Sequence, residues 1–459
     1  MSEYSNDEEE KSPRNYDDQS IDDMQFSDKN QIDDRLETQN DEFSLNAEQQ
    51  NMASGTELVN QRAMSEKTLG GYNSTRFSQM VEDLLQKYRI PHYGIMTSNT
   101  RFEVIQPALI NNKYVTYHIN GEDSLGQFDG KRRYNEFYQL RNILCVRWPG
   151  VFVPAIPPKK AVGNKDVKFI IERRYYLERF LKQISLQQNL LNSEEFRIFA
   201  RPEFTGGNSD VQSQLLKLPK INYDEMGAKY IESFGLNEVQ FKRIADRQQD
   251  YETKLLEFEN FLRKLLLQYK ALRKQLKGLA EIQDQAVQNQ RDSTNDLYKS
   301  LRDMCEKTRN PFTSLYYWVK GEILDCNAFQ EAIHQRSQLT LLIQKMSAKK
   351  LSQQNELDKL LGGKKSIRTF FKSSNEKQNY SITLQKQIDQ TDKQIEGLIS
   401  MGIVLDWHLG DFMMPTFKKD KIDNFSHILR EMSSTEVENS NVGAMHWSKV
   451  LSNQNLKHF

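Results

Sequence analysis

The chain has few cysteines and no long run of apolar residues. Its three cysteines, Cys145, Cys305 and Cys326, lie far apart in 459 residues and show no paired spacing. This argues against a disulfide framework and a zinc motif, and it favours a reducing compartment. No window reaches the roughly 18 consecutive apolar residues of a membrane-spanning helix, and the N-terminal MSEYSNDEEE is unlike a signal peptide. We therefore expect a soluble protein whose membrane contacts are peripheral.

Catalytic motifs are also missing. The sequence contains no phosphate loop of the GxxxxGK type, no GxSxG elbow and no HExxH, and its seven histidines are dispersed. His408, beside Trp407 and near Asp411, comes nearest to a catalytic group, but packing along a helix explains it better. We expect no enzymatic activity, no catalytic residue, no metal site, no cofactor and no nucleic-acid partner.

The net charge of zero conceals a strong asymmetry along the chain. Lys plus Arg and Asp plus Glu each number 63, but residues 1–50 contain 16 acidic and 4 basic side chains, so their net charge is −12 and that of the remainder is +12. Residues 1–95 are rich in Asp, Glu, Asn, Gln and Ser. Such a segment cannot offset its conformational entropy by burial. We predict a disordered acidic N-terminal region over residues 1–95.

Between residues 97 and 203 the pattern changes to that of an α+β domain. FEVIQPALI is strand-like, KYVTYHI alternates between two faces, and GEDSLGQFDG supplies a turn that contains glycine. A strand that ends near Tyr134 is followed by a helix in RRYNEFYQLRNIL, and DVKFIIERRYYLERFLKQI forms a second helix with a broad apolar face. We predict a three-stranded antiparallel sheet with helices.

After about residue 235 the sequence predicts only long helices. Between positions 255 and 279 apolar residues recur at alternating intervals of three and four, which is the spacing of a coiled-coil seam. A second helix is predicted from the Asn-Pro pair at 310–311 to Leu361, where two glycines end it. A third runs from about Tyr380, and Pro415 should kink it. The pattern indicates an elongated all-α bundle of three helices.

Three basic stretches offer a common chemistry: KRRY at 131–134, VPAIPPKK at 153–160 and FIIERRYYLERF at 169–180. Taken singly, they are also explained by a solvated strand edge, a PxxP ligand for another module and a surface helix. Taken together, they supply what a phosphorylated inositol head group requires. These groups are a forked donor for one phosphate, a lysine for a second, and an aromatic ring to cover the inositol.

In their order, the strand with RRY, the helix, the proline-rich turn with lysine and the helix with ERR resemble the PX (phox homology) domain over residues 97–203. The resemblance implies a phosphatidylinositol 3-phosphate site. Arg133 would hold the 3-phosphate, Tyr134 would pack on the inositol ring, Lys159 would bind the 1-phosphate, and Arg173 would bond the 4- and 5-hydroxyls. Each charge-assisted contact contributes roughly 1.5 to 3 kcal/mol.

With the helices behind it, the chain resembles the PX-BAR sorting nexins, most closely the sorting-nexin-4-like group. The helical half, residues 235–459, would then be a BAR domain for dimerisation and curvature, and YYWVKGEILDCNAFQEAIHQR at 316–336 is its most family-like stretch. A spectrin-like bundle and an ordinary coiled-coil dimer remain alternatives from the residues alone. Candidate membrane contacts are the cations around the end of the second helix, Lys349, Lys350, Lys364, Lys365 and Arg368.

Residues 204–234 are expected to link the two domains. Within them SDVQSQLLKLPKINY, residues 209–223, is interpreted equally well as a short amphipathic membrane helix or as a linker held on the bundle.

The resemblance implies a cytoplasmic protein, peripheral on the cytosolic face of early endosomes. There it would bind phosphatidylinositol 3-phosphate, form a homodimer or a heterodimer with another sorting nexin, and sense or generate curvature in protein sorting. The alternative is a coiled-coil scaffold or an autophagy-related adaptor without membrane-bending activity. Cargo, route and dimer composition do not follow from the sequence.

Overall fold

The computed structural model describes most of the chain after residue 101. The described residues are 77, 79–81, 102–111, 113–159, 166–205, 210–289, 296–362 and 374–452. By its contacts the chain divides into residues 1–72 and residues 73–459, and all described residues belong to the second unit. The predicted disorder of residues 1–95 therefore falls almost wholly outside the described residues.

Three antiparallel strands form one sheet in the order β1 (Phe102–Ile110), β2 (Tyr114–Asp123) and β3 (Gly126–Arg133). This confirms the predicted sheet. The β2–β3 turn needs glycine at Gly126, whose φ of +102° lies in the region that side chains disfavour. On β2, Tyr117 and Ile119 face the core, while the alternate positions lie on the opposite face.

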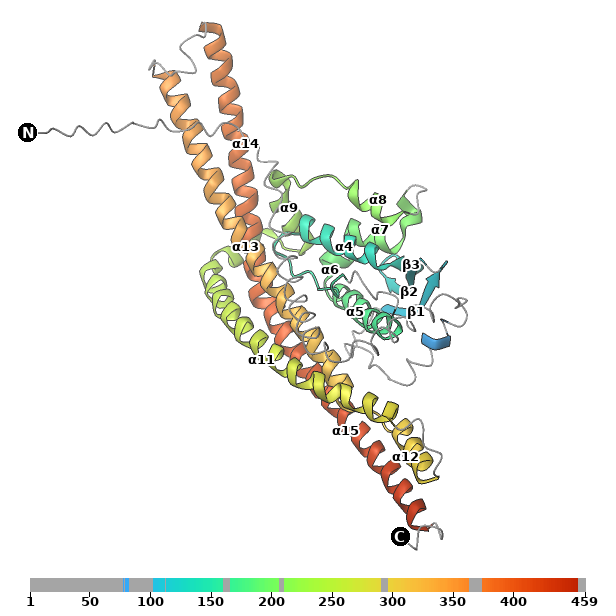
Figure 1. Cartoon of the computed structure of the whole chain (residues 1–459). Helices are drawn as coiled ribbons and strands as arrows, with labels where there is room; N and C mark the ends of the chain where they lie inside the picture. Colours follow the sequence, from blue (N-terminus) through green and yellow to red (C-terminus); the bar gives the residue numbers. More distant parts are fainter. Residues whose placement is uncertain are drawn as a thin grey trace, which may run out of the picture. The chain divides into compact units, whose positions relative to one another are not determined.

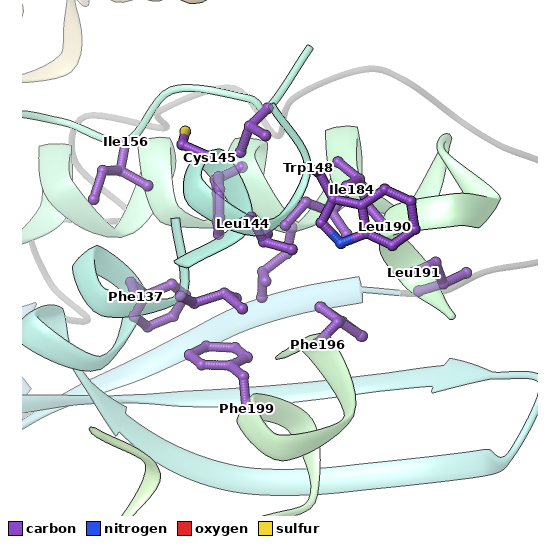
Figure 2. Close-up of a cluster of buried hydrophobic side chains, with 14 of the residues drawn as sticks. Phe137, Leu144, Cys145, Trp148, Ile156, Ile184, Leu190, Leu191, Phe196 and Phe199 are labelled. Atoms are coloured by element: carbon purple, nitrogen blue, oxygen red, sulfur yellow. The ribbon is translucent and has the colours of Figure 1, made fainter. Parts of the chain in front are cut away.

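Helices cover one face of this sheet (Figure 1). They are α4 (Tyr134–Arg147), α5 (Val167–Ser185), α6 (Gln188–Leu191) and α7 (Glu194–Ala200), followed by a 3₁₀ turn at Pro202–Thr205. The N-termini of α5 and α7 are capped by the side chains of Asp166 and Ser193, which accept from backbone N–H groups of the first turn. Figure 2 shows the shared core, in which Phe137, Leu144 and Phe199 are buried.

Arg132 ties β3 to α7 from within this core. The residue is 6% exposed, and its guanidinium donates from Nε to the carbonyl oxygen of Phe199 at 2.7 Å and from Nη2 to that of Ala200 at 3.2 Å. These two carbonyls lie at the C-terminal end of α7, where carbonyl groups lack helical partners. Burial lowers the pKa of Arg132. This arginine is therefore part of the fold.

The rest of the described chain is helical. The helices are α8 (Val211–Leu216), α9 (Tyr223–Ser233), α10 (Glu238–Ala245), α11 (Gln248–Asn289), α12 (Asp296–Lys307), α13 (Phe312–Leu361), α14 (Ser374–Trp407) and α15 (Met414–Ser452). At about 1.5 Å per residue the 50 residues of α13 span about 75 Å. None of the helices within the described ranges is both long and apolar enough to cross a membrane.

The predicted end of the second helix at Leu361 is confirmed and its start lies one residue later than predicted, whereas the third helix begins at Ser374 and not near Tyr380. Asn310 precedes α13 and accepts from the N–H of Phe312 at 2.9 Å, and Gly362 follows its last residue. Between α14 and α15 a π-helix, His408–Met413, takes the place of the predicted kink. Pro415 explains it, because its ring displaces the carbonyl of the preceding turn and a π-turn accommodates the displacement without ending the helix.

The predicted seam is the buried face of α11, and it packs within the chain against α13 (Figure 1). Leu255, Phe258 and Leu262 share a cluster with Phe329 of α13. The pattern ends before Leu279, which is 42% exposed. The three-four spacing thus identified the correct face, and its partner is another helix of the same chain.

The segment at 209–223 forms only a short helix, α8, on the sheet-containing region. Val211 and Leu215 are fully buried in the main core, where α8 contacts α4 and α7, while Leu216 is exposed. Its apolar face is therefore covered by protein, and neither interpretation described this arrangement. The next helix, α9, packs along α14.

An ionic cluster buried between α5, α13 and α15 joins the sheet-containing region to the bundle. Arg179 donates to Glu322 at 3.1 Å and to Asp325, and Lys421 contacts Glu322 at 2.7 Å and also Asp325. Gln183 donates to Asp325 at 3.0 Å. Burial alone would raise the pKa of Asp325, but Arg179 and Lys421 hold it below its usual value.

The helices can approach at this cluster because Gly321 has no side chain. A Cβ built there would overlap the guanidinium of Arg179.

We predict that Arg179→Met lowers the free energy of unfolding by about 3 to 5 kcal/mol, because it leaves buried carboxylates with a single remaining cation. Urea denaturation of the full chain, followed by circular dichroism, measures the change. The matched control is Lys320→Met, which breaks a partly exposed pair with Glu172 between the same two helices and should cost no more than about 1 kcal/mol. Equal losses for both variants would contradict a special role for the buried cluster.

We also predict that Arg132→Ala costs about 1 to 3 kcal/mol, because it leaves the carbonyls of Phe199 and Ala200 without their donor. Lys131→Ala, at the exposed neighbouring position, should change the free energy by less than about 0.5 kcal/mol. Urea denaturation again measures the change. An unchanged free energy of unfolding in Arg132→Ala would contradict the prediction and would mean that water donates to the two carbonyls in place of the arginine.

Candidate functional site

The alternation of side chains along β3 places the three cations of KRRY on two different sides of the strand. Arg132 is turned into the core, while Lys131 and Arg133 are exposed. Arg133 is the last residue of β3, and its backbone N–H donates to the carboxylate of Glu136 in the first turn of α4 at 2.5 Å. Its Cζ lies 3.5 Å from the centre of the Tyr114 ring. The arginine that sequence reasoning selected is thus the exposed one of the pair.

Tyr134 and Arg173 lie directly against each other. The Cζ of Arg173 is 3.9 Å from the centre of the Tyr134 ring and 4.4 Å from that of Phe169. Tyr134 is buried, and its hydroxyl donates to the carbonyl oxygen of Pro157 at 2.6 Å. The proline-rich turn is thereby fixed to the start of α4. One face of the ring already carries Arg173, so the contact of Tyr134 with an inositol ring stays a prediction.

Arg173 is itself largely buried, with 7% of its surface exposed, and its Nε has no hydrogen-bond partner among the described residues. Behind it lies the phenol of Tyr117. Burial raises the pKa of Tyr117 to about 12, and the positive charge of Arg173 acts in the opposite direction. An arginine with an unused buried donor has capacity left for a ligand.

Lys159 completes the group from the proline-rich turn. It is exposed, and its Nζ lies 3.7 Å from the centre of the Tyr138 ring. The rings of Tyr138 and Tyr134 are 6.4 Å apart. The structure therefore brings Arg173, Tyr134, Tyr138 and Lys159 into one continuous set of contacts, and Arg133 adjoins it in the chain.

The electrostatics of this group differ from those of its surroundings. In the part of the chain that the structure describes, none of Arg133, Lys159 and Arg173 forms an ion pair with a carboxylate. Neighbouring arginines do: Arg147 pairs with Glu195, and Arg201 donates to both oxygens of Asp123. Three cations that lie beside aromatic rings and form no ion pair with a described carboxylate favour an anion with more than one negative group.

Tyr114, Tyr138 and Phe169 were missed by the sequence reasoning. The signal for Tyr114 was the alternation of KYVTYHI. Tyr114 and Thr116 occupy the same sheet face, and Thr116 is the register partner of Arg133. The pairing of β2 with β3 was needed to connect the two residues.

The predicted membrane contacts are only partly described. Lys349 is exposed, and Lys350 pairs with Asp392 of α14. Lys364, Lys365 and Arg368 lie outside the described residues. No group of metal-ligating side chains is found among the described residues.

His408 is a packed side chain, as the sequence suggested. It is buried, its ring stacks on that of Phe412, and it also lies against Phe234. Burial lowers its pKa to about 3.

A surface hollow of about 280 Å³ lies elsewhere, where α10, α11 and the end of α14 meet. Within its lining Arg247 lies 3.9 Å from the carboxylate of Asp411, which also pairs with Lys254 at 2.7 Å. It is lined by Leu236, Gln240, Arg243, Ile244, Arg247, Tyr251, Trp407 and Asp411. It contains none of the predicted site residues.

The same region of the chain is similar to a known protein family. The family model of the PX domain matches residues 121–203. Sorting nexin 2A of Arabidopsis thaliana is 28% identical over 145 residues, which cover 28% of this chain and 25% of that protein. The vacuolar protein sorting-associated protein vps5 of Schizosaccharomyces pombe is 36% identical over 84 residues, 18% of this chain and 15% of that protein. The matches thus span about a quarter or less of these relatives.

A solved chain, from the cryo-EM structure of the SNX-BAR Mvp1 tetramer, aligns over 76% of this chain and all of its own length. The TM-score is 0.35 and the sequence identity is 16%, which is too low to support a conclusion. The PX match and the sorting nexin relatives agree on this region of the chain. The chain therefore contains a PX domain and is similar in that region to sorting nexins.

Proposed function

We propose that the protein binds phosphatidylinositol 3-phosphate through Arg133, Tyr134, Lys159 and Arg173, and that it acts in protein sorting at the cytosolic face of early endosomes. One observation carries the proposal. Arg173 lies against Tyr134, Lys159 lies over the adjacent ring of Tyr138, and Arg133 directly precedes Tyr134 in the chain. None of these three cations forms an ion pair with a described carboxylate. A head group with two phosphates supplies the missing negative charge.

The proposed roles differ with exposure. Arg133 is accessible and presents a charged fork, so it takes the 3-phosphate. Lys159, also accessible, takes the 1-phosphate that joins the head group to the lipid. Arg173 is buried deeper and less able to move, and a fixed donor of this kind suits the ring hydroxyls better than a second phosphate.

The helical half is proposed to form a BAR dimer with itself or with another sorting nexin, and to sense or generate curvature. Support comes from α15, where Ile422, Phe425 and Leu429 are spaced for one helix face and are between 37% and 66% exposed. A dimer doubles the number of lipid sites on one particle, which raises avidity by roughly 10² to 10⁴ when both are engaged. Lys349, Lys364, Lys365 and Arg368 remain the proposed contacts of the bundle with anionic lipid.

We predict that Arg133→Ala lowers the affinity for vesicles containing phosphatidylinositol 3-phosphate about ten- to hundredfold, because a charge-assisted contact is lost. Flotation of the full chain with phosphatidylcholine vesicles, with and without this lipid, measures the affinity. Lys131→Ala is the matched control, since it removes a neighbouring exposed charge and should change binding by less than about threefold.

Equal losses for Arg133→Ala and Lys131→Ala would mean that the cations act only through net charge. A wild-type chain that fails to bind the lipid selectively would refute the proposal and would favour the protein-binding scaffold.

We further predict that Ile422→Asp dissociates the dimer without unfolding the chain, because this exposed side chain would face a partner and not the core of its own bundle. Multi-angle light scattering gives the mass, and circular dichroism gives the helix content. Dissociation of the dimer should also reduce the tubulation of anionic vesicles. Lys419→Asp, at an exposed polar position of α15, serves as the control. A monomeric wild-type chain at micromolar concentration would rule out a homodimer.

A further inference from the structure

Each of the three cations that are predicted to bind the head group lies over the face of an aromatic ring. Arg133 lies over Tyr114 at 3.5 Å, Lys159 over Tyr138 at 3.7 Å, and Arg173 over Tyr134 at 3.9 Å. Two other arginines of the sheet-containing region lie farther from rings. Arg132 is 5.6 Å from the ring of Phe199, and Arg201 is 5.1 Å from that of Phe128.

This mode of contact leaves the donors of an arginine available. A guanidinium is a plane with five N–H groups that point outward in that plane, and an aromatic face attracts the plane without accepting those hydrogens. Arg132 and Arg201 are held differently, by carbonyl and carboxylate oxygens that use their donors. Arg133 is therefore held in place without the loss of the fork that a phosphate needs.

The backbone explains why Tyr114 reaches Arg133. Thr116 is opposite Arg133 in the β2–β3 ladder, and Tyr114 lies two residues away on the same face, within reach of a long diagonal neighbour. Tyr114 is half-buried at the first position of β2. It belongs to no described aromatic pair, so the described ring contact in which it takes part is the one to Arg133.

We propose that Tyr114 and Tyr138 are positioning residues of the lipid site, which hold Arg133 and Lys159 over their ring faces and so pre-organise these cations for phosphate. The inference rests on the proposed function. An exposed arginine or lysine otherwise samples many rotamers, and binding must restrict them. A ring that restricts them beforehand raises affinity without contacting the ligand.

The test compares ring removal with ring retention. In the full chain, Tyr114→Leu should weaken binding of soluble short-chain phosphatidylinositol 3-phosphate about two- to fivefold, as expected for a partly exposed cation–ring contact. Tyr114→Phe should bind as the wild type does, because it keeps the ring face and loses only the hydroxyl. Tyr138→Leu and Tyr138→Phe should behave in the same way. Isothermal titration calorimetry measures the affinities, and thermal unfolding midpoints should not change.

Tyr316→Leu is the matched control, because it removes a tyrosine of α13 whose ring also faces a lysine, Lys320, at 5.4 Å. It should leave lipid affinity unchanged. If Tyr114→Leu binds the soluble lipid as the wild type does, the inference is wrong while the proposed function stands. If the loss appears with vesicles but not with the soluble lipid, Tyr114 contacts the membrane itself, which also overturns the inference. If the wild type does not bind the soluble lipid, the proposed function fails first.

Discussion

The burial of charge between α5 and α13 is the constraint on which the arrangement of this chain depends. Arg179, Glu322, Asp325 and Lys421 are all removed from water, and their charges compensate one another. Such a cluster tolerates little displacement, because a shift of either helix leaves a buried charge without its partner. Apolar surfaces, by contrast, can slide at small cost. The cluster therefore specifies one relative placement of the two helices.

The helix α5 serves two surfaces at once. Arg173 lies against Tyr134 in the proposed lipid site, and Arg179, six residues later, lies in the ionic cluster with the bundle. Six residues correspond to about 600° of rotation, so the two side chains lie about 120° apart around the helix axis. The proposed lipid site and the contact with the bundle therefore lie on different sides of one rigid helix, which gives the proposed site a defined orientation with respect to α13.

Local periodicity predicted the elements well and their partners poorly. The alternation in KYVTYHI, the three-four spacing after Leu255 and the glycines after Leu361 each report on a few neighbouring residues, and each gave the correct strand, face or helix end. The contact of Tyr114 with Arg133 requires the β2–β3 register, and that of Arg179 with Asp325 joins residues 146 positions apart. Neither of these two contacts can be inferred from the neighbouring sequence. The lipid site could be proposed from the sequence because its motifs are chemically distinctive, whereas Tyr114 and Tyr138, which lie under two of its cations, are ordinary tyrosines.

The contact between α5 and α13 depends on the missing side chain of Gly321. A Cβ at this position would occupy the space of the Arg179 guanidinium. Even alanine would displace the guanidinium of Arg179 from its buried carboxylate partners. A single methyl group at this position would therefore weaken the junction between the PX region and the helical bundle.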